Sequence, residues 1–204
     1  MKIIDLSQPI LSGMPVYPGD SPVRLTQTRF LASDYHNNFQ LEISMHVGTH
    51  IDGPRHLLHS DLSILELPLD RFMGQGCLLD VSGEREIHWK SEYKGLVPEN
   101  SIVLLYSGHD QFYGTPRYFQ GYPRVTLEFA QELITRNTKL LGLDWPSPDV
   151  FPFHVHKALL AENIYIIENL TNLQELLGHS FEVCALPLKL KADSALVRAA
   201  ARLK

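Results

Sequence analysis

The chain has 204 residues, 44% of them hydrophobic, and carries 18 Lys and Arg against 23 Asp and Glu. Its formal charge of −5 offers no basic surface to a nucleic-acid backbone or an anionic membrane, so we expect neither as a partner. No apolar run reaches the roughly 18 residues of a membrane span, and the N-terminal residues lack the apolar core of a secretory signal. Two cysteines, Cys77 and Cys184, are too few for a disulfide framework. These features predict a cytoplasmic protein with two buried free thiols.

The chain shows no internal repeat, low-complexity tract or linker-like stretch. A chain of this length buries about 70% of its unfolded surface in one compact core. We therefore expect residues 1–204 to form a single domain.

Short β-like runs outnumber helical patterns along the chain. The predicted strands are Ile3–Leu6, Phe39–His46, Gly76–Val81, Ile102–Tyr106, Leu140–Leu143, Ile164–Ile167 and Phe181–Leu190. The predicted helices are Leu127–Lys139, with Thr126 as its N-cap, and the shorter His156–Glu162. Ala199–Leu203 fits either a closing helix or a frayed tail. The pattern indicates a mixed α/β fold, rich in strands and with few helices.

Four of the ten histidines lie in Ser44–His59, which has the sequence S-M-H-V-G-T-H-I-D-G-P-R-H-L-L-H. Imidazole and carboxylate groups are common ligands of zinc and manganese, so His46, His50 and Asp52 are candidate metal ligands. A helix would turn Asp52 away from the histidines, and a straight strand would separate His46 and Asp52 by about 20 Å. We therefore expect a strand end followed by a tight loop that bends at Gly48 and at Gly53-Pro54.

His156 and Glu168 are candidates for the rest of the site. A helix that starts at His156 leads the chain about 10 Å away, and the following strand brings it back about 13 Å. Glu168 then ends near His156, which favours a shared metal site. The alternatives are a helix-capping or packed histidine and a surface carboxylate at a strand end.

The charge of this ligand set suits one or two divalent ions, since Asp52 and Glu168 neutralise one ion and leave about +2 on a pair. Zn²⁺ is the favoured ion and Mn²⁺ the alternative. Such an ion acidifies water to a pKa of about 7 and thereby supplies a nucleophile. The chain has no G-x-S-x-G motif and no evident Cys–His pair, so a covalent acyl-enzyme is not indicated.

His56 lies four residues beyond Asp52, where its imidazole is available as a general acid and base. The alternatives are that it is a further metal ligand or that it orients Asp52. The turn Tyr17-Pro18-Gly19-Asp20 places an aromatic ring where it is a candidate for substrate binding, although a plain surface turn fits the same residues.

The segment His46-Val-Gly-Thr-His50-Ile-Asp52-Gly-Pro-Arg-His56 resembles the H-x-G-T-H-x-D-x-P-x-H signature of the cyclase-family metal-dependent hydrolases. That family includes bacterial kynurenine formamidases and isatin hydrolases. The resemblance continues through Asp5-Leu6-Ser7, Tyr17-Pro18-Gly19-Asp20, Glu66-Leu67-Pro68-Leu69, Ile167-Glu168-Asn169-Leu170 and Ala185-Leu186-Pro187-Leu188, and so covers nearly the whole chain.

The resemblance implies a swivelling β/β/α fold, a homodimer or higher homo-oligomer, and metal-dependent hydrolysis of a C–N bond in an amide, aryl formamide or lactam, with an N-formylkynurenine-like compound as one candidate. It assigns His46, His50, Asp52, His156 and Glu168 to one or two metals and His56 to acid/base catalysis. The chain differs from the family at Ser107-Gly108-His109, where a Thr-Gly-Trp-like segment is expected, and at His154. The substrate is therefore not assigned by the resemblance.

Two rival functions fit part of the pattern. His50, Asp52 and His156 also match the H-x-D…H triad of non-haem iron oxygenases, but that assignment leaves His46 and Glu168 without a role. A non-catalytic metal-binding protein would carry the same ligands, but it would have no need of His56.

Overall fold

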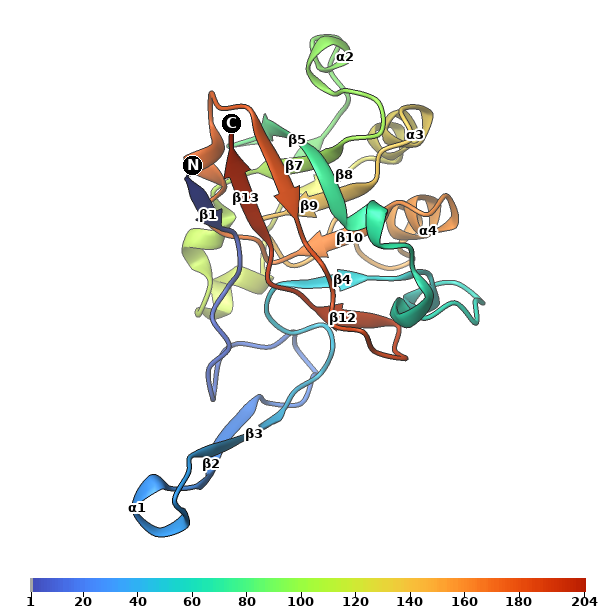
Figure 1. Cartoon of the computed structure of the whole chain (residues 1–204). Coiled ribbons are helices and arrows are strands. Elements are labelled where there is room, and N and C mark those ends of the chain that lie inside the picture. Colours follow the sequence, from blue (N-terminus) through green and yellow to red (C-terminus); the bar gives the residue numbers. More distant parts are fainter. Residues whose placement is uncertain (1) are drawn as a thin grey trace.

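The computed structural model describes residues 2–204, which form one strand-rich α/β domain (Figure 1). The strands are β1 (Ile3–Asp5), β2 (Arg24–Arg29), β3 (Asn38–Glu42), β4 (His50–Asp52), β5 (Met73–Asp80), β6 (Glu86–Ile87), β7 (Ile102–Tyr106), β8 (Arg124–Val125), β9 (Leu140–Leu143), β10 (Tyr165–Glu168), β11 (Phe181–Cys184), β12 (Ser194–Leu196) and β13 (Ala200–Leu203). The α-helices are α1 (Leu31–Asp34), α2 (Tyr93–Leu96), α3 (Leu127–Thr135) and α4 (His154–Ala161). The predicted α/β class, with many strands and few helices, is confirmed.

A nine-stranded mixed sheet is the framework of the domain, in the order β1-β13-β11-β5-β7-β9-β10-β4-β12. Strands β5, β7, β9 and β10 are parallel, and antiparallel strands flank them on both sides. Strands β1 and β13 pair with each other, so the N-terminal and C-terminal segments lie side by side.

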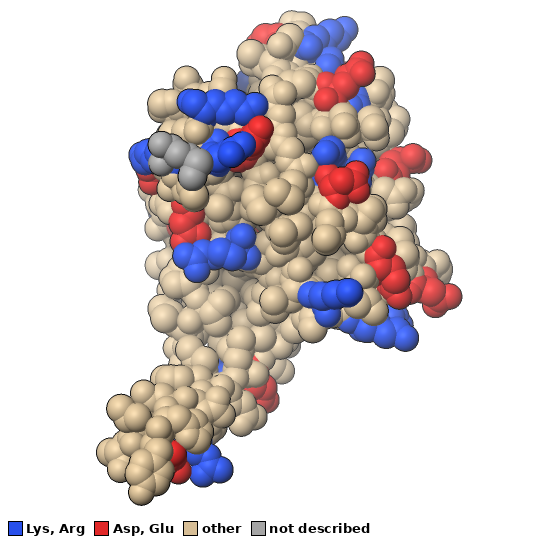
Figure 2. All heavy atoms as spheres, viewed as in Figure 1, with Lys and Arg blue, Asp and Glu red and all other residues tan. Residues whose placement is uncertain are grey.

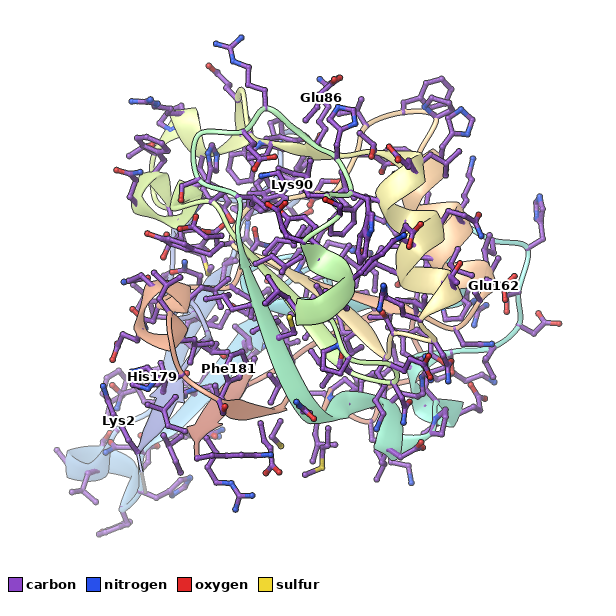
Figure 3. The ribbon with its side chains drawn as sticks, turned by 90° about the horizontal axis from the view of Figure 1, so that it is seen from above. Lys2, Glu86, Lys90, Glu162, His179 and Phe181 are labelled. Atoms are coloured by element: carbon purple, nitrogen blue, oxygen red, sulfur yellow. The ribbon has the colours of Figure 1, made fainter. Side chains whose placement is uncertain are left out.

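Helices cover one face of the parallel strands. The order β5-β7-β9-β10 advances in one direction along the sheet, and right-handed crossovers in one direction place their helices on the same face. Helices α3 and α4 accordingly contact each other, and in the view from above α3 (yellow) lies in front of α4 (orange) (Figure 3). The Thr126 hydroxyl accepts a hydrogen bond from the Phe129 amide and so caps α3, as predicted.

The central strands are buried on both faces, and strands of this kind have continuous apolar sequences. Ile102–Leu105 of β7 and most of β9 and β10 are inaccessible, which explains their continuous apolar sequences. Gly142 in β9 has a specific reason to be glycine, because an added Cβ would lie 2.5 Å from a Leu104 methyl group. Within residues 2–204, no helix has both the length and the hydropathy of a membrane span.

Several predicted elements differ from the structure at their ends. The C-terminal segment is the strand β13, not a helix or a tail, because it fits between β1 and β11. The predicted strand Phe39–His46 ends at Glu42, and Phe181–Leu190 ends at Cys184. Helix α3 ends at Thr135, four residues early, and Asn137 then takes a left-handed conformation. Both cysteines are free, but Cys184 is only half-buried.

Within the described residues 2–204, strands β2 and β3 pair only with each other, and they project from the body as a long arm, seen in blue at the lower left of Figure 1. Sequence patterns indicated neither β2 nor the arm. A small second hydrophobic cluster, formed by Met14, Val23 and Val47, lies at the base of the arm.

Candidate metal centre

Sheet register places three predicted ligands on one face of the sheet. In the antiparallel pair of β4 and β10, His50 is opposite Glu168 and Asp52 is opposite Ile166. Residues that are opposite each other, or two positions apart in a strand, project to the same face. His50, Asp52 and Glu168 therefore share a face, where all three are buried.

The bend and the strand occur along the chain in the opposite order to the one predicted from the sequence. The sharp bend comes first, at residues 45–49, and the ligand-bearing strand β4 follows it. Gly48 makes the bend with φ of +67°, and a Cβ there would lie 2.7 Å from Ile10. Gly53-Pro54 then ends β4 and begins a 3₁₀ turn that carries His56.

The ligand atoms lie at the separations expected around a metal ion. His50 Nε2 is 3.5 Å from Asp52 Oδ1 and 3.4 Å from Glu168 Oε2. His156 Nε2 is 3.7 Å from Asp52 Oδ2 and 3.3 Å from Glu168 Oε1. Two ligands that bind one tetrahedral zinc at 2.0–2.1 Å are about 3.3 Å apart. Each carboxylate thus directs one oxygen toward His50 and the other toward His156, a geometry that fits one ion or a bridged pair.

Unsatisfied buried atoms provide a second test of whether a cation fits. His50 Nε2 and both Asp52 carboxylate oxygens are buried and have no hydrogen-bond partner among the described residues. Leaving such groups unpaired costs about 1–3 kcal/mol each, and more where they are charged. A divalent ion would satisfy all three atoms, so the residues present fit a metal.

The other nitrogen of each ligand histidine is fixed by an oxygen acceptor. His50 Nδ1 lies 2.9 Å from the Gly48 carbonyl, and His156 Nδ1 lies 2.5 Å from Asp149 Oδ1. An acceptor at Nδ1 holds the proton there and leaves the Nε2 lone pair free for a metal. Asp149 also accepts a hydrogen bond from the Val155 amide, which anchors the first turn of α4 to the same carboxylate.

His46 completes the cluster from its more exposed side. Its Nδ1 is 2.9 Å from Asp52 Oδ1, although that contact has unsuitable hydrogen-bond geometry, and its Nε2 is 2.9 Å from Asp193 Oδ2. The His46 side chain keeps 27% of its accessible surface, against 1% for His50. The structure therefore brings together all five residues predicted as ligands: His46, His50, Asp52, His156 and Glu168.

His56 lies beside the cluster. Its ring centroid is 4.1 Å from that of His46 and 6.1 Å from that of His156, and its Nδ1 is 3.4 Å from Asp193 Oδ2. Its side chain is 28% exposed and lines the adjoining pocket. The ring is thus close to the ligand atoms and also open to a molecule in the pocket.

The electrostatics of the cluster favour a bound cation. Burial lowers the pKa of the His50 imidazole, but contacts with Asp52 and Glu168 outweigh burial and raise it to about 10 in the chain without metal. Burial raises the pKa of Asp52, but contacts with His156, His46 and His50 hold it well below its usual value. The two buried carboxylates therefore attract positive charge to this site.

Burial lowers the pKa of His56 below its usual value of 6.5, and the neighbouring imidazoles His46 and His156 act in the same direction against the opposing charge of Asp52. A histidine of this kind is neutral near pH 7 and can accept a proton.

A pocket of about 210 Å³ opens onto the cluster. Its aromatic wall consists of Tyr17, Phe119 and Phe153, and its floor includes His46, His56, His156 and Glu168. Tyr17 packs edge-on against Phe119 with ring centroids 5.7 Å apart. The structure thus places Tyr17 at the rim of this pocket.

Phe153 is held in a strained conformation at the start of α4. Its φ of 61° and ψ of 48° lie in the left-handed region, which costs a bulky residue about 1–3 kcal/mol. The ring packs edge-on against His156 at 5.7 Å. The strain therefore places an aromatic wall directly over a candidate ligand.

The sequence analysis missed Asp149, Asp193 and Asn169, all of which support the cluster. Asn169 donates a hydrogen bond to the Gly48 carbonyl and accepts one from the Tyr118 hydroxyl, so it secures the bend before β4. No spacing rule connects Asp193 with His46, 147 residues away. A carboxylate partner for His156 could have been expected, because a histidine that binds a metal usually donates its other N–H to an oxygen acceptor, but its spacing does not identify Asp149.

Neither of the other two histidines considered joins the cluster. His109 is buried, and its Nε2 pairs with the Tyr118 carbonyl, while His154 is exposed on the first turn of α4. Ser107 and Gly108 instead surround Asp144, which accepts hydrogen bonds from both of their amides.

Comparison with known proteins agrees with this geometry. The model of a family described as putative cyclase matches residues 4–150. The chain belongs to this cyclase family. An uncharacterised protein of Methanocaldococcus jannaschii is 31% identical over 195 residues, which cover 93% of this chain and 92% of that protein.

Kynurenine formamidases are also similar to this cyclase-family chain. The enzyme of Bacillus mycoides is 30% identical over 205 residues, covering 98% of this chain and 96% of its own. A solved structure described as a potential metal-dependent hydrolase with cyclase activity has a TM-score of 0.81 at 25% identity, covering 98% and 96% of the two chains. Isatin hydrolase A from Labrenzia aggregata has a TM-score of 0.87 at 23% identity, covering 98% and 93%. The neighbours share the fold expected from the sequence resemblance.

Proposed function

We propose that this protein is a metal-dependent hydrolase that cleaves the C–N bond of a small amide, aryl formamide or lactam. The observation that carries the proposal is that His50 Nε2 and both Asp52 oxygens converge beside an open pocket. All three atoms are buried and have no hydrogen-bond partner in residues 2–204. The similarity to kynurenine formamidases and to the potential metal-dependent hydrolase supports the same reaction class.

In the proposed site, His46, His50, Asp52, His156 and Glu168 hold one or two divalent ions. The ion would acidify water and polarise the substrate carbonyl. Zn²⁺ is the first choice and Mn²⁺ the second, because a mixed set of imidazoles and carboxylates suits both. Asp149 and the Gly48 carbonyl fix the tautomers of His156 and His50 and so present the correct nitrogen to the metal.

His56 is the proposed general base and acid. Its lowered pKa keeps the imidazole neutral at pH 7, so it can take a proton from the attacking water. His56, now protonated, can then donate that proton to the substrate nitrogen, which leaves as the C–N bond breaks. Asp193 contacts both His46 and His56 and would orient the two rings relative to each other.

The pocket indicates the class of substrate. Its aromatic wall suits a flat ring, and at about 210 Å³ it suits a small molecule. We assign Tyr17 to substrate binding on this basis. An N-formylkynurenine-like compound or a lactam fused to an aromatic ring fits both the pocket and the activities named for the relatives.

The rival functions are less well supported. An oxygenase triad would use His50, Asp52 and His156 and leave Glu168 idle, yet Glu168 lies within 3.4 Å of two ligand histidines. A purely structural metal would not need an open pocket with a neutral histidine beside it.

The proposal also includes a place in the cell and a state of assembly. Two free cysteines suit the cytoplasm, and the family resemblance suggests a homodimer or a higher homo-oligomer. Small molecules are the expected partners, with no role for nucleic acid or membranes.

The test is a panel of aryl formamides, isatin and other cyclic amides, assayed with protein that has been stripped by a chelator and reloaded with Zn²⁺ or Mn²⁺. We expect hydrolysis of at least one aromatic amide by the reloaded protein and none by the stripped protein. Full activity after stripping would contradict a metal-dependent mechanism. Inactivity on the whole panel, with metal bound, would contradict the proposed substrate class.

A further inference from the structure

Asn169, the residue after strand β10, holds the carbonyl group that orients a candidate metal ligand. It is buried and takes a left-handed conformation with φ of +61°, which asparagine tolerates better than most residues. Its side-chain nitrogen Nδ2 donates a hydrogen bond of 2.8 Å to the Gly48 carbonyl. The same carbonyl lies 2.9 Å from His50 Nδ1. The Gly48 oxygen therefore has one donor for each of its two lone pairs.

The Gly48 carbonyl determines which end of the Asn169 amide group faces it. A carbonyl oxygen only accepts hydrogen bonds, so the amide nitrogen Nδ2 faces it and the amide oxygen Oδ1 points elsewhere. Half a turn of the amide would place Oδ1 against the carbonyl oxygen, where the two acceptors repel each other. It would also bring an acceptor close to His50 Nδ1, which Nδ2 now approaches to 3.4 Å. The orientation of this amide therefore bears directly on His50.

The Tyr118 hydroxyl is the hydrogen-bond partner of the amide oxygen. It lies 2.7 Å from Asn169 Oδ1, and the whole tyrosine is inaccessible to solvent. Because Oδ1 can only accept, the hydroxyl is the donor. Burial raises the pKa of this hydroxyl well above its usual value, so it keeps the proton that it donates. A buried chain of hydrogen bonds thus connects Tyr118, through Asn169 and the Gly48 carbonyl, to His50 Nδ1.

A separate contact holds the backbone of the same two segments together. The Thr49 hydroxyl donates a hydrogen bond of 2.6 Å to the Asn169 carbonyl and accepts one from the Gln8 amide. Neither bond involves the Asn169 side chain or Tyr118. Removal of the Tyr118 hydroxyl should therefore free the amide group of Asn169 without unfolding the bend before β4.

We propose that Tyr118 is a positioning residue for the metal centre, and that it acts through Asn169 to hold the Gly48 carbonyl against His50 Nδ1. Without the hydroxyl, Asn169 Oδ1 would be buried with no partner, and the amide would turn toward another donor and release the carbonyl. The His50 ring would then lose the acceptor that fixes it, and its Nε2 would no longer be aimed at the metal. This inference rests on the metal site of the proposed function and does not depend on the reaction.

The position of Tyr118 in the chain also connects the metal centre with the pocket. One 3₁₀ turn, Pro116–Phe119, carries both Tyr118 and Phe119, and Phe119 forms part of the aromatic wall. The rings of the two neighbours pack edge-on with centroids 5.2 Å apart. The same turn therefore supports a ligand histidine on one side and forms the pocket wall on the other.

Surface charge on the visible face of the molecule offers no alternative means of setting His50. Figure 2 shows Lys and Arg side chains next to Asp and Glu side chains on this face, without a patch of one sign. Mixed charges of this kind largely cancel at a distance, and salt screens what remains. Local hydrogen bonds are therefore the stronger influence on the buried imidazole.

The test is the affinity of metal-free protein for Zn²⁺, measured by calorimetric titration. Tyr118→Phe removes only the hydroxyl, and we expect it to bind Zn²⁺ about 10-fold more weakly than the wild type. Asn169→Gly keeps the left-handed backbone, which glycine adopts freely, and should weaken binding by about 10–100-fold. The matched control is Tyr113→Phe, which should bind Zn²⁺ like the wild type. The Tyr113 ring packs 5.0 Å from that of Tyr118, but its buried hydroxyl has no hydrogen-bond partner among residues 2–204.

The double variant Tyr118→Phe/Asn169→Gly tests whether Tyr118 acts through Asn169. Its Zn²⁺ affinity should equal that of Asn169→Gly alone, because the hydroxyl then has no amide to position. The visible absorption of Co²⁺-loaded protein, which reports the geometry of the ligands, is a second readout. The Co²⁺ spectrum should change in Tyr118→Phe and stay unchanged in Tyr113→Phe.

Three results would overturn the proposed role of Tyr118. The first is wild-type affinity and a wild-type Co²⁺ spectrum in Tyr118→Phe. The second is an equal loss of affinity in Tyr113→Phe, which would show a general effect on packing. The third is a double variant that binds Zn²⁺ more weakly than Asn169→Gly by the full factor of Tyr118→Phe. None of these measurements requires turnover, so a wild-type protein that binds the metal but hydrolyses no amide would count against the proposed function alone, whereas one that binds no metal would contradict both.

Discussion

Strands β3 and β4 are separated only by residues 43–49, yet β3 is fully exposed and β4 is fully buried. Strand β4 lies between β10 and β12, so it is hydrogen-bonded along both edges. This pairing fixes the register of its side chains. Among the described residues the arm that contains β3 pairs with no other strand, and at its base the Ser12 hydroxyl hydrogen-bonds the backbone of Leu25. The candidate metal ligands of β4 therefore lie in a highly constrained part of the sheet, whereas the strand β3 a few residues earlier is exposed.

This contrast predicts the largest effect at Asp52, the last residue of β4. Asp52→Asn keeps the shape of the side chain but removes its negative charge. In the wild-type protein the two carboxylate oxygens face His50 Nε2 and His156 Nε2. We expect metal binding to be lost and amide hydrolysis to fall by about 10³-fold or more, since the metal supplies several kcal/mol of catalysis. Metal content and turnover are measured on the same sample. Asp61→Asn, on the exposed surface, is the control, and a variant at Asp52 with normal metal content would contradict the assignment.

His56→Ala separates catalysis from metal binding. We expect turnover to fall by about 10²–10⁴-fold, the usual contribution of a general acid and base, while metal content is unchanged. His59→Ala replaces an exposed histidine of the same turn region and should leave both quantities at the wild-type level. If His56→Ala also loses the metal, His56 is a ligand and the proposed role is wrong.

Asp149→Asn tests the residue that sequence reasoning missed. The carboxylate accepts from His156 Nδ1 and from the Val155 amide with different oxygens, whereas the amide replaces one of these oxygens with an NH2 donor. One of the two bonds is therefore lost, and metal affinity should fall by about 10–100-fold. A calorimetric titration of metal-free protein measures this directly. Asp70→Asn, at an exposed position, should bind metal normally. Unchanged affinity in Asp149→Asn would show that the contact is only structural.

The contrast also predicts that substitutions in the core and in the arm have different effects on the free energy of unfolding. Leu104→Ala in the inaccessible centre of β7 should lower the free energy of unfolding by about 2–5 kcal/mol, because it leaves a cavity. Leu41→Ala in β3 should change it by about 0.5 kcal/mol or less when the protein is dilute. Denaturant titrations at several concentrations check both values. A cost at Leu41 as large as that at Leu104 would contradict the contrast between the core and the arm.

The smallest predicted effect is a shift in the pKa of a single residue, His56. Burial should hold the His56 imidazole below its usual pKa of 6.5, and a divalent cation nearby should lower it further. Below its pKa the imidazole is protonated and cannot act as a base. Because the pKa of His56 is lowered, His56 remains an active base to more acidic pH than an exposed histidine does. NMR titration of the ring proton, with exposed His59 as the internal reference, measures it. A pKa of 6.5 or above for His56 would contradict the predicted environment.

The central strands and the grouping of His46, His50 and Asp52 could be predicted from the sequence because their signals are local. Leu140–Leu143 is a short apolar run between polar residues, and it is the strand β9 without change. His46, His50 and Asp52 lie within seven residues, and their spacing alone required the bend that Gly48 makes. Comparison with cyclase-family relatives adds the reaction class, which spacing cannot supply.

The arm and the orienting carboxylates could not be predicted because their signals are not local. Five of the six residues of Arg24–Arg29 are polar, and only pairing with β3 makes the segment a strand. Ala200–Leu203 favours a helix in isolation, and only the gap between β1 and β11 makes it β13. Asp193 reaches His46 only because β12 completes the sheet beside β4.

Anomalous X-ray diffraction from crystals soaked in Zn²⁺ or Mn²⁺ most directly tests the claim that Asp52 is the centre of a metal site. The account predicts one or two strong anomalous peaks about 2.0–2.2 Å from an Asp52 oxygen, within bonding distance of His50 Nε2 or His156 Nε2. Peaks only at surface residues, with the Asp52 oxygens still unbound, would contradict it.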